Sequence, residues 1–243
     1  MDTSIVQQPT GDGFDTLYST EYQQTYHSKR GALIEAEYVF FNGTGVKQRL
    51  IEGLSARILE IGFGTGLNFW LTAYHSRLTN TLLHYVALEK NLLPAEMLTQ
   101  LNHGALFEGI AEIRQAFLDW RTSLSHPVPD KMLRWDFSDA VRLELILGDA
   151  TQVEIPQRGY HAVYHDAFSP NVNPELWAPD FFARLYAVMS PGGKLATYSA
   201  RGLVRRNMQA AGFYVQKLPG PPGKREMIVG THQTSFSTQY VLR

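Results

Sequence analysis

Short apolar runs alternate with amphipathic stretches along most of the chain. Five runs rich in Ile, Leu and Val predict buried β-strands, and apolar residues at helical spacing follow most of them. The predicted strands cover residues 57–61, 82–88, 143–147, 160–165 and 194–199. Strands that alternate with helices are typical of a parallel sheet with helices on both faces.

The last part of the chain has a different pattern. Residues 213–218 and 226–231 flank the Gly-Pro-Pro-Gly turn at 220–223, and this arrangement predicts an antiparallel hairpin. The hairpin brings the expected sheet to seven strands in a Rossmann-like α/β fold. Residues 119–142 contain prolines and the alternating run Met132–Phe137, so we interpret them as a local hairpin extension.

Length and composition favour one substantial domain, because 243 residues with 44% hydrophobic residues can bury a single large core. We expect an N-terminal extension or lid at 1–50, a catalytic domain at 51–231 and a tail at 232–243. No apolar run approaches the roughly 20 residues of a membrane span. The N-terminus lacks the features of an export signal. These absences favour a cytoplasmic protein.

The inventory of reactive side chains excludes several classes of chemistry. The chain has no cysteine, and hence no thiolate nucleophile or cysteine-based metal centre. Its eight histidines are scattered without the spacing of paired ligands, so we expect no metal.

The net charge of −1 conceals an asymmetry. Residues 194–225 contain seven basic residues and no acidic ones, which leaves 15 basic against 23 acidic residues in the rest of the chain. A basic C-terminal quarter can present a phosphate-binding face. The alternative is a solvated surface with chance clustering.

The loop Glu60-Ile61-Gly62-Phe63-Gly64-Thr65-Gly66 follows the first strand and precedes a helix. Glycines allow the backbone to approach a ligand closely, and the amides at the helix start can bind it. The spacing is Gly-x-Gly-x-Gly, which differs from that of dinucleotide binders. By itself the loop is also compatible with a structural turn.

Two acids at strand ends extend this pattern. Glu89 ends the second strand, where Rossmann-like sheets bind ribose hydroxyls, and Asp149 ends the third strand, near an adenine edge. Either acid alone could be a helix cap. Together with the loop they predict S-adenosylmethionine, with Glu60 near its amino group, and hence a methyltransferase. The other expected cofactor contacts are Phe63, Thr65, Asn68, Lys90, Ala150 and Asp166.

Asp166 ends the fourth strand and faces the same crevice. Methyl transfer is an in-line displacement that depends on positioning, and a carboxylate can orient an amine and accept its proton. Phe168 and Trp177 could stack on a base or shield the sulfonium. The alternatives are a cap for Asp166 and core positions for the two aromatic residues.

Residues 26–40 mix polar, aromatic and basic side chains and are interpreted as a lid, or as a surface hairpin over the sheet edge.

Several motifs together resemble one family, the methyltransferase domain of the bifunctional tRNA-modifying enzyme MnmC, which also occurs alone as MnmD. The resemblance covers about residues 14–230 and is carried by Tyr26-His27-Ser28 with Gly31-Ala32, 35–40, 60–69, Asp166-Ala167-Phe168-Ser169-Pro170, 173–177, 190–193, 204–206, 211–213 and Lys224-Arg225-Glu226-Met227.

The resemblance implies methylation of the 5-aminomethyl group of the tRNA wobble uridine, in the anticodon loop, to give 5-methylaminomethyl-(2-thio)uridine. It implies that Asp166 lies next to the reacting amine, with Phe168 and Tyr26 as pocket walls. The expected tRNA contacts are His27, Ser28, Arg30, Arg201, Arg205, Arg206, Lys224 and Arg225. The flavin-dependent domain of the bifunctional enzyme follows this region, whereas the present chain ends at Arg243, so no FAD chemistry is expected.

Other functions remain open at this point. An aminopropyltransferase of the spermidine-synthase type shares the fold and also joins an amine to a sulfonium carbon, but the basic residues at 194–225 suit RNA phosphates better than a polyamine. Two further alternatives are another amine N-methyltransferase and a non-enzymatic RNA-binding module with a vestigial pocket. The intact acids and glycines argue against the vestigial module.

Overall fold

The computed structural model describes residues 5–102, 111–124, 131–156 and 159–233. In these residues the main element is an eight-stranded sheet with the order β10-β11-β9-β8-β4-β5-β7-β6. The strands are β4 (Ala56–Ile61), β5 (Leu83–Glu89), β6 (Met132–Ser138), β7 (Val141–Leu147), β8 (Tyr160–His165), β9 (Met189–Thr197), β10 (Tyr214–Pro219) and β11 (Glu226–Thr231).

The five central strands β7, β5, β4, β8 and β9 are parallel, as predicted. The predicted hairpin is confirmed too: β10 and β11 are antiparallel, and β11 joins them to β9. The strand order reverses at β4, which has β5 on one side and β8 on the other. In open α/β sheets ligands bind at the carboxyl ends of the strands beside such a reversal.

The interpretation of residues 119–142 as a local extension was wrong in two respects. Residues up to 123 belong to helix α5 (Ala111–Ser123), because its buried Ile113 and Phe117 continue at helical spacing. Strand β6 then pairs antiparallel with β7 and becomes an eighth strand of the main sheet, with Leu133 and Trp135 buried. Of the prolines in this segment, Pro127 and Pro129 lie outside the described residues.

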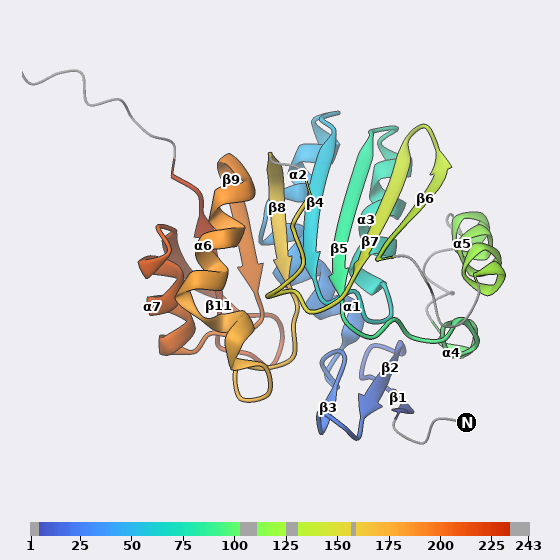
Figure 1. The fold of residues 1–243 in the computed structure, drawn as a ribbon, viewed down its shortest axis with the longest axis horizontal. Helices are drawn as coiled ribbons and strands as arrows, with labels where there is room; N and C mark the ends of the chain where they lie inside the picture. The colour runs from blue at the N-terminus through green and yellow to red at the C-terminus, as the bar shows by residue number, and fades with distance from the viewer. Residues whose placement is uncertain (1–4, 103–110, 125–130, 157–158, 234–243) are drawn as a thin grey trace, which may run out of the picture.

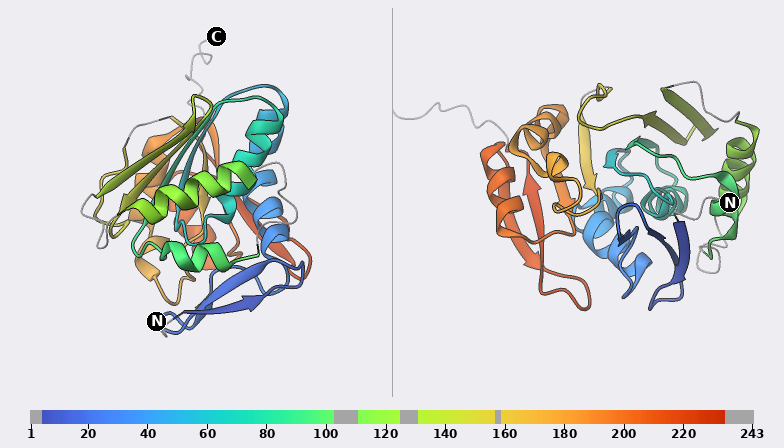
Figure 2. Two further views of the ribbon diagram at one scale, coloured as in Figure 1. Left: turned by 90° about the vertical axis from the view of Figure 1, so that its right-hand side faces the viewer. Right: turned by 60° about the horizontal axis from the view of Figure 1, so that its bottom comes forward.

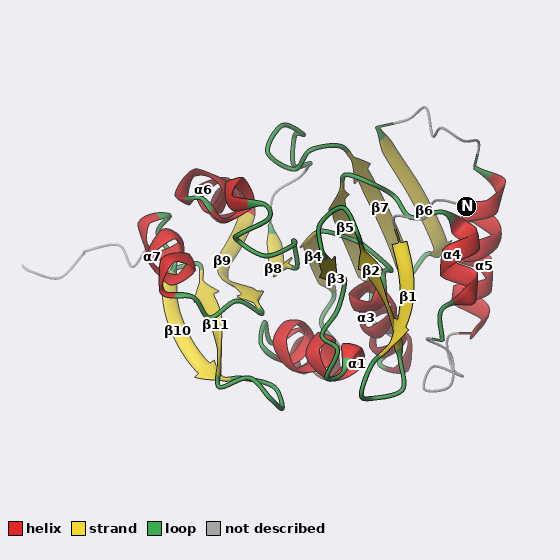
Figure 3. Cartoon of the chain, turned by 90° about the horizontal axis from the view of Figure 1, so that it is seen from below, coloured by secondary structure: helices red, strands yellow, loops and turns green. Residues whose placement is uncertain are grey.

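Helices cover the two faces of the sheet (Figure 1). On one face, Phe40, Phe69 and Phe117 pack in the core beneath helices of the first half of the chain. On the other face, Trp177, Phe182 and Met208 form a second core. The helices are α1 (Ala32–Glu35), η1 (Ala36–Asn42), α2 (Val46–Ile51), α3 (Leu67–Leu78), α4 (Ala95–Gln100) and α5, then η3 (Pro174–Trp177), α6 (Pro179–Val188) and α7 (Gly202–Ala210). Figure 3 shows α6 and α1 on opposite sides of the strands.

A small separate sheet precedes this domain. Its antiparallel strands β1 (Ile5–Pro9), β2 (Asp15–Ser19) and β3 (Gln24–Thr25) lie across the ends of the main strands toward which the arrows point (Figure 2). The N-terminal segment therefore covers the carboxyl ends of the parallel strands. No helix in the described part of the chain is long and apolar enough to cross a membrane.

Candidate active site

The glycine loop connects β4 to α3, and each of its glycines has a conformation or contact that a side chain would disturb. Gly62, Gly64 and Gly66 have φ angles of 87°, 50° and 79°, all in the left-handed region. A Cβ on Gly62 would come within 3.0 Å of the Asp166 carbonyl oxygen. The loop from β4 and the loop from β8 can therefore lie against each other because residue 62 is glycine.

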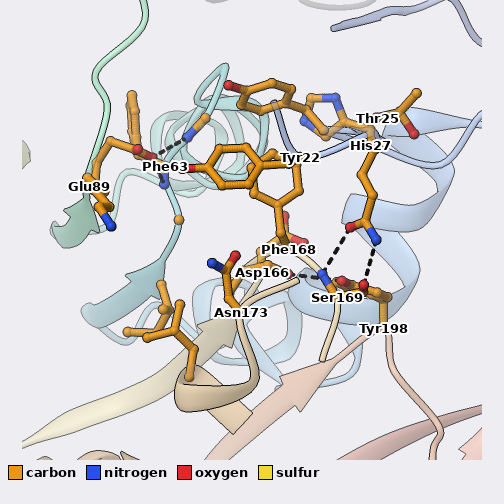
Figure 4. A pocket seen from close by; sticks show the side chains of 18 of the residues that line it. Tyr22, Thr25, His27, Phe63, Glu89, Asp166, Phe168, Ser169, Asn173 and Tyr198 are labelled. Carbon is orange, nitrogen blue, oxygen red and sulfur yellow. Dashed lines mark hydrogen bonds between the residues drawn. The ribbon is translucent and has the colours of Figure 1, made fainter. Parts of the chain in front are cut away.

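A cavity of about 550 Å³ opens at the carboxyl ends of the strands, between the glycine loop and the N-terminal sheet (Figure 4). This volume is within the range of small-molecule sites. The residues singled out from the sequence that line it are Tyr26, His27, Ser28, Gly62, Phe63, Gly64, Glu89, Lys90, Asp149, Ala150, Asp166, Phe168 and Lys224.

The other expected site residues do not line this cavity. Four are buried in the glycine loop or in the helix that follows it, namely Glu60, Thr65, Gly66 and Asn68. The remaining five lie outside the cavity, namely Arg30, Arg201, Arg205, Arg206 and Arg225. Of these arginines, Arg30 donates a hydrogen bond to the carbonyl oxygen of Gly223, and Arg201 donates one to Asn171 Oδ1 at 2.6 Å.

Glu89 binds the glycine loop directly. Its Oε2 accepts hydrogen bonds from the amides of Phe63 at 2.9 Å and Gly64 at 3.0 Å, and its Oε1 accepts one from Asn91 at 2.8 Å. Burial raises the pKa of Glu89, and the backbone hydrogen bonds oppose that shift. Oε1 accepts only one of these three hydrogen bonds and has a second lone pair, so a ribose contact is compatible with this geometry and remains a prediction.

At the adjacent strand end, Asp149 Oδ1 accepts hydrogen bonds from the hydroxyl and the amide of Thr151, at 2.7 and 2.9 Å. These bonds, and Lys90 at 3.5 Å, lower the pKa of Asp149. The ionised Asp149 and Lys90 thus flank the cavity beside Glu89. The adenine contact expected of Asp149 stays a prediction.

Asp166 lines the cavity immediately after β8 (Figure 4). Its Oδ2 accepts a hydrogen bond from Asn68 Nδ2 at 2.9 Å, and the same nitrogen donates to Glu60 Oε1 at 2.8 Å. Burial, followed by the charges of Glu60 and Glu35, raises the pKa of Asp166. A carboxyl group with a raised pKa in a cavity is suited to accepting a proton.

Three aromatic rings form the wall above Asp166. Tyr22 stacks on Phe168 at 4.5 Å between centroids, and Tyr26 meets the same ring edge-on at 5.2 Å. The Tyr22 hydroxyl also accepts a hydrogen bond from Asn91 Nδ2 at 3.3 Å. In contrast, Trp177 is only 2% exposed and donates its indole N–H to the Phe168 carbonyl at 2.9 Å, so it is a core residue.

Two sets of hydrogen bonds attach the N-terminal segment to the site. Gln24 Nε2 donates to Ser169 Oγ at 2.5 Å, and its Oε1 accepts from the Ser169 amide at 3.0 Å. His27 bridges two hydroxyls, with Nδ1 3.1 Å from Thr16 Oγ1 and Nε2 3.2 Å from Thr65 Oγ1. The segment is therefore joined both to the glycine loop and to the loop that follows Asp166.

A third cluster lies at the other side of Asp166. Glu35 accepts hydrogen bonds from Lys224 Nζ and, at 3.0 Å, from the Ser28 amide. Lys224 also lies 4.8 Å above the Tyr198 ring, and the Tyr198 hydroxyl donates to the Ala167 carbonyl at 2.9 Å. Glu35, Tyr198, Gln24 and Tyr22 were not selected from the sequence as site residues. The Glu35-containing motif of the family resemblance was the available signal for one of them.

The described residues contain no group of three or more His, Cys, Asp or Glu side chains arranged to hold a metal ion. The cavity instead combines carboxyl groups at strand ends with aromatic walls. Those features fit a nucleoside that carries a positively charged sulfur, because aromatic faces attract cations.

The sheet and the glycine loop at its strand reversal define a Rossmann-like methyltransferase that uses S-adenosylmethionine. A family model described as S-adenosyl-L-methionine-dependent methyltransferase matches residues 111–233, just over half of the chain. The chain belongs to this family, and S-adenosylmethionine is its methyl donor.

Similar proteins agree with the resemblance drawn from the motifs. The tRNA 5-methylaminomethyl-2-thiouridine biosynthesis bifunctional protein MnmC of Cupriavidus metallidurans is 40% identical over 225 residues, which cover 88% of this chain and 32% of the relative. The corresponding protein of Cupriavidus necator is 37% identical, covering 93% of this chain and 34% of the relative. The chain thus spans about a third of the length of these relatives.

Among solved structures, MNMC2 from Aquifex aeolicus is similar with a TM-score of 0.78 and 28% identity, covering 95% of this chain and 71% of that one. Spermidine synthase from Thermotoga maritima has a TM-score of 0.52 at 12% identity, covering 93% of this chain and 72% of that one. The second likeness concerns the fold alone.

Proposed function

We propose that this chain transfers a methyl group from S-adenosylmethionine to the 5-aminomethyl nitrogen of the wobble uridine in tRNA, giving 5-methylaminomethyl-(2-thio)uridine. The observation that carries the proposal is Asp166, a carboxyl group in the cavity beside the glycine loop. The similarity to MnmC proteins, whose name includes this nucleoside, supports the choice of acceptor.

The chemistry requires an acceptor nitrogen with a free electron pair. Bound S-adenosylmethionine supplies a methyl group on a sulfonium. Asp166 orients the ammonium group of the acceptor and accepts one of its protons, and Phe168 and Tyr26 hold the acceptor against the cofactor site. Gly62, Phe63 and Gly64, with Glu89, Lys90, Asp149 and Ala150, form the cofactor side of the cavity; Thr65, Gly66 and Asn68 support it from below.

Polar and basic residues in the cavity and outside it are proposed to bind the phosphates of the anticodon loop. His27, Ser28 and Lys224 line the cavity, whereas the outer contacts come from Arg30, Arg201, Arg205, Arg206 and Arg225. Phosphate contacts position a nucleic acid, and the extruded base is then read in the pocket. Extrusion costs little in a loop that is already unpaired.

The domain division proposed from the sequence fits this function, with residues 1–50 as an extension over the catalytic domain at 51–231. A cytoplasmic location is proposed because that is where the tRNA substrate occurs. Residues 232–243, proposed as a tail, lie mostly outside the described part of the chain.

The test is to incubate the protein with methyl-labelled S-adenosylmethionine and tRNA that carries 5-aminomethyluridine, and to identify the labelled nucleosides after digestion. Labelled 5-methylaminomethyluridine is expected from the native chain, and the Asp166→Asn variant should bind the cofactor without turnover. Label in any other nucleoside, or wild-type turnover by the variant, contradicts the proposal. Putrescine with decarboxylated S-adenosylmethionine serves as a parallel assay for the aminopropyltransferase alternative.

A further inference from the structure

Asn68 connects two carboxyl groups. Its side-chain amide carries two hydrogens, and Nδ2 donates to Glu60 Oε1 at 2.8 Å and to Asp166 Oδ2 at 2.9 Å. Glu60 is near the end of β4, Asp166 follows β8, and Asn68 is in the first turn of α3. Because β4 and β8 are neighbours, the helix after the glycine loop brings its amide between the two acids.

The two acids have different surroundings. Glu60 is 1% exposed and does not line the cavity, whereas Asp166 does. Glu60 Oε2 is buried and no described residue makes a well-formed hydrogen bond to it, although the Tyr85 hydroxyl is near enough to lower the pKa of Glu60. A buried carboxylate with an unpaired oxygen is costly, and protonation removes that cost.

We propose that Glu60 remains protonated and neutral in the working enzyme, and that it acts through Asn68 as a positioning residue for Asp166, which carries the only negative charge of the pair. Asn68 then fixes Oδ2 of Asp166 and leaves Oδ1 for the acceptor amine. The identity of that amine rests on the proposed function, whereas the protonation of Glu60 does not.

The electrostatic surroundings support this assignment. Burial raises the pKa of Glu60 to about 8, although Asn68 and the Tyr85 hydroxyl lower it, and Glu89 adds to the increase. Burial is the largest cause of the raised pKa of Asp166, and a charge on Glu60 would raise it further. A neutral Glu60 removes that repulsion, so the pKa of Asp166 is lower than it would be beside a charged Glu60, and burial alone opposes its ionisation from this side.

The other groups acting on Asp166 come from several elements. Glu35 of α1 raises its pKa and Lys224 of the β10–β11 turn lowers it. Burial raises the pKa of Tyr198 and of Tyr85, and the charge of Asp166 adds to both increases. Lys224 is hydrogen-bonded to Glu35, so these two charges offset each other, and Glu60 and Asp166 remain as the groups whose protonation changes the charge of the site.

The proton and electron balance of the reaction is consistent with a neutral Glu60. The ammonium group gives a proton to the Asp166 carboxylate, and the freed nitrogen pair forms the N–C bond as the C–S bond breaks toward sulfur. The product amine keeps its positive charge, and Asp166 later releases its proton to solvent. Glu60 keeps its proton throughout, so the pair alternates between one negative charge and none.

A carboxyl-carbon NMR titration of the full chain, labelled with ¹³C at the glutamate carboxyl position, tests the protonation directly. Glu60→Gln identifies the resonance by its loss, and Glu52→Gln, at an exposed position, is the matched control. The Glu60 resonance should titrate with a midpoint near pH 8. A midpoint near the ordinary value of 4.5 overturns the proposal.

Asn68→Ala provides a second variant in case Glu60→Gln does not fold. It removes a hydrogen bond that lowers the pKa of Glu60, so the titration midpoint of the Glu60 resonance should rise further above pH 8. No movement of that resonance would show that Asn68 does not connect the two acids.

The pH profile of kcat separates positioning from a purely structural role. Above pH 8 Glu60 is ionised and adds a second negative charge beside Asp166. This charge stabilises the unreactive ammonium form of the acceptor, so kcat of the native chain should decline with a midpoint near pH 8. Glu60→Gln should lack this decline, while Glu52→Gln keeps it. Identical profiles for all three proteins refute the positioning role. If 5-aminomethyluridine is not methylated at all, the proposed function fails, and the NMR titration still decides the protonation of Glu60.

Discussion

Tyr26 covers Gly64 so closely that a Cβ built on the glycine would lie 2.9 Å from Cδ1 of the tyrosine ring. The contact joins the N-terminal segment to the cofactor loop directly above the cavity. It depends on residue 64 having no side chain, and on a backbone φ of 50° that other residues rarely adopt.

Gly64→Ala should therefore weaken S-adenosylmethionine binding at least about tenfold, because both the loop and Tyr26 must shift, and tenfold corresponds to about 1.4 kcal/mol. Isothermal titration calorimetry measures the effect. Gly192→Ala is the control, since Gly192 has a φ of 78° and no atom within 4 Å of its Cβ position. The control should lose some stability and keep its affinity. Equal affinities for both variants would show that the Tyr26–Gly64 contact does not support the cofactor site.

Lys224→Met should destabilise the protein by about 1–3 kcal/mol, because Glu35 loses its cation while its side chain is only 12% exposed. Urea unfolding measures the change. The control is Lys217→Met, which removes an ion pair to Glu226 whose side chains are 41% and 35% exposed, and should cost about 0–1 kcal/mol.

Adding Glu35→Gln to Lys224→Met should recover part of the lost stability, since the buried charge is then removed together with its partner. Strictly additive effects of the two changes would indicate that Glu35 and Lys224 do not interact in solution.

The free energy of unfolding should depend on pH through Glu60. The pKa of Glu60 is about 8 in the folded chain against an ordinary value of 4.5, so the folded state binds the extra proton between these values. The contribution of Glu60 to stability is thus complete below pH 4.5 and is lost as the pH rises through 8, at up to about 1.4 kcal/mol per pH unit.

Chemical denaturation of the native chain and of Glu60→Gln at several pH values between 5 and 8 measures this slope. The glutamine variant should become progressively more stable relative to the native chain as the pH rises. Parallel curves for the two proteins would mean that Glu60 does not titrate in this range.

Replacing Arg205 and Arg206 by alanine should weaken tRNA binding and reduce the dependence of log K on log salt by about one unit for each lost phosphate contact. Both residues are on α7, which packs near strand β10 at one edge of the sheet. Arg134→Ala, on β6 at the opposite edge, is the control and should leave the salt dependence unchanged. An unchanged slope for the α7 variant would place the RNA on another surface.

The sequence predicted most of the elements because apolar periodicity is a local signal. The strand before the glycine loop, the hairpin at the end of the chain and Asp166 after the fourth apolar run were all read from residues adjacent in the chain. The interpretation of residues 119–142 was wrong because an edge strand with alternating burial, such as β6, has the same pattern in an isolated hairpin as in the main sheet.

The contacts that shape the acceptor end of the cavity could not be predicted in this way. Gln24 and Ser169 are 145 residues apart, and Lys224 and Glu35 are 189 residues apart. No periodicity relates such positions, since their distance depends on how the N-terminal sheet and the last hairpin pack against the main sheet.

By itself the sequence determined the fold class, the methyl donor and the strand ends at which the acidic residues stand, because each follows from local patterns and from the rule that parallel strands share a carboxyl edge. Only the tertiary structure decided which of those acids face the cavity. It buried Glu60 behind Asn68, exposed Asp166 to the cavity and placed Tyr26 over Gly64, because side-chain burial and direction depend on contacts among segments that are distant in the chain.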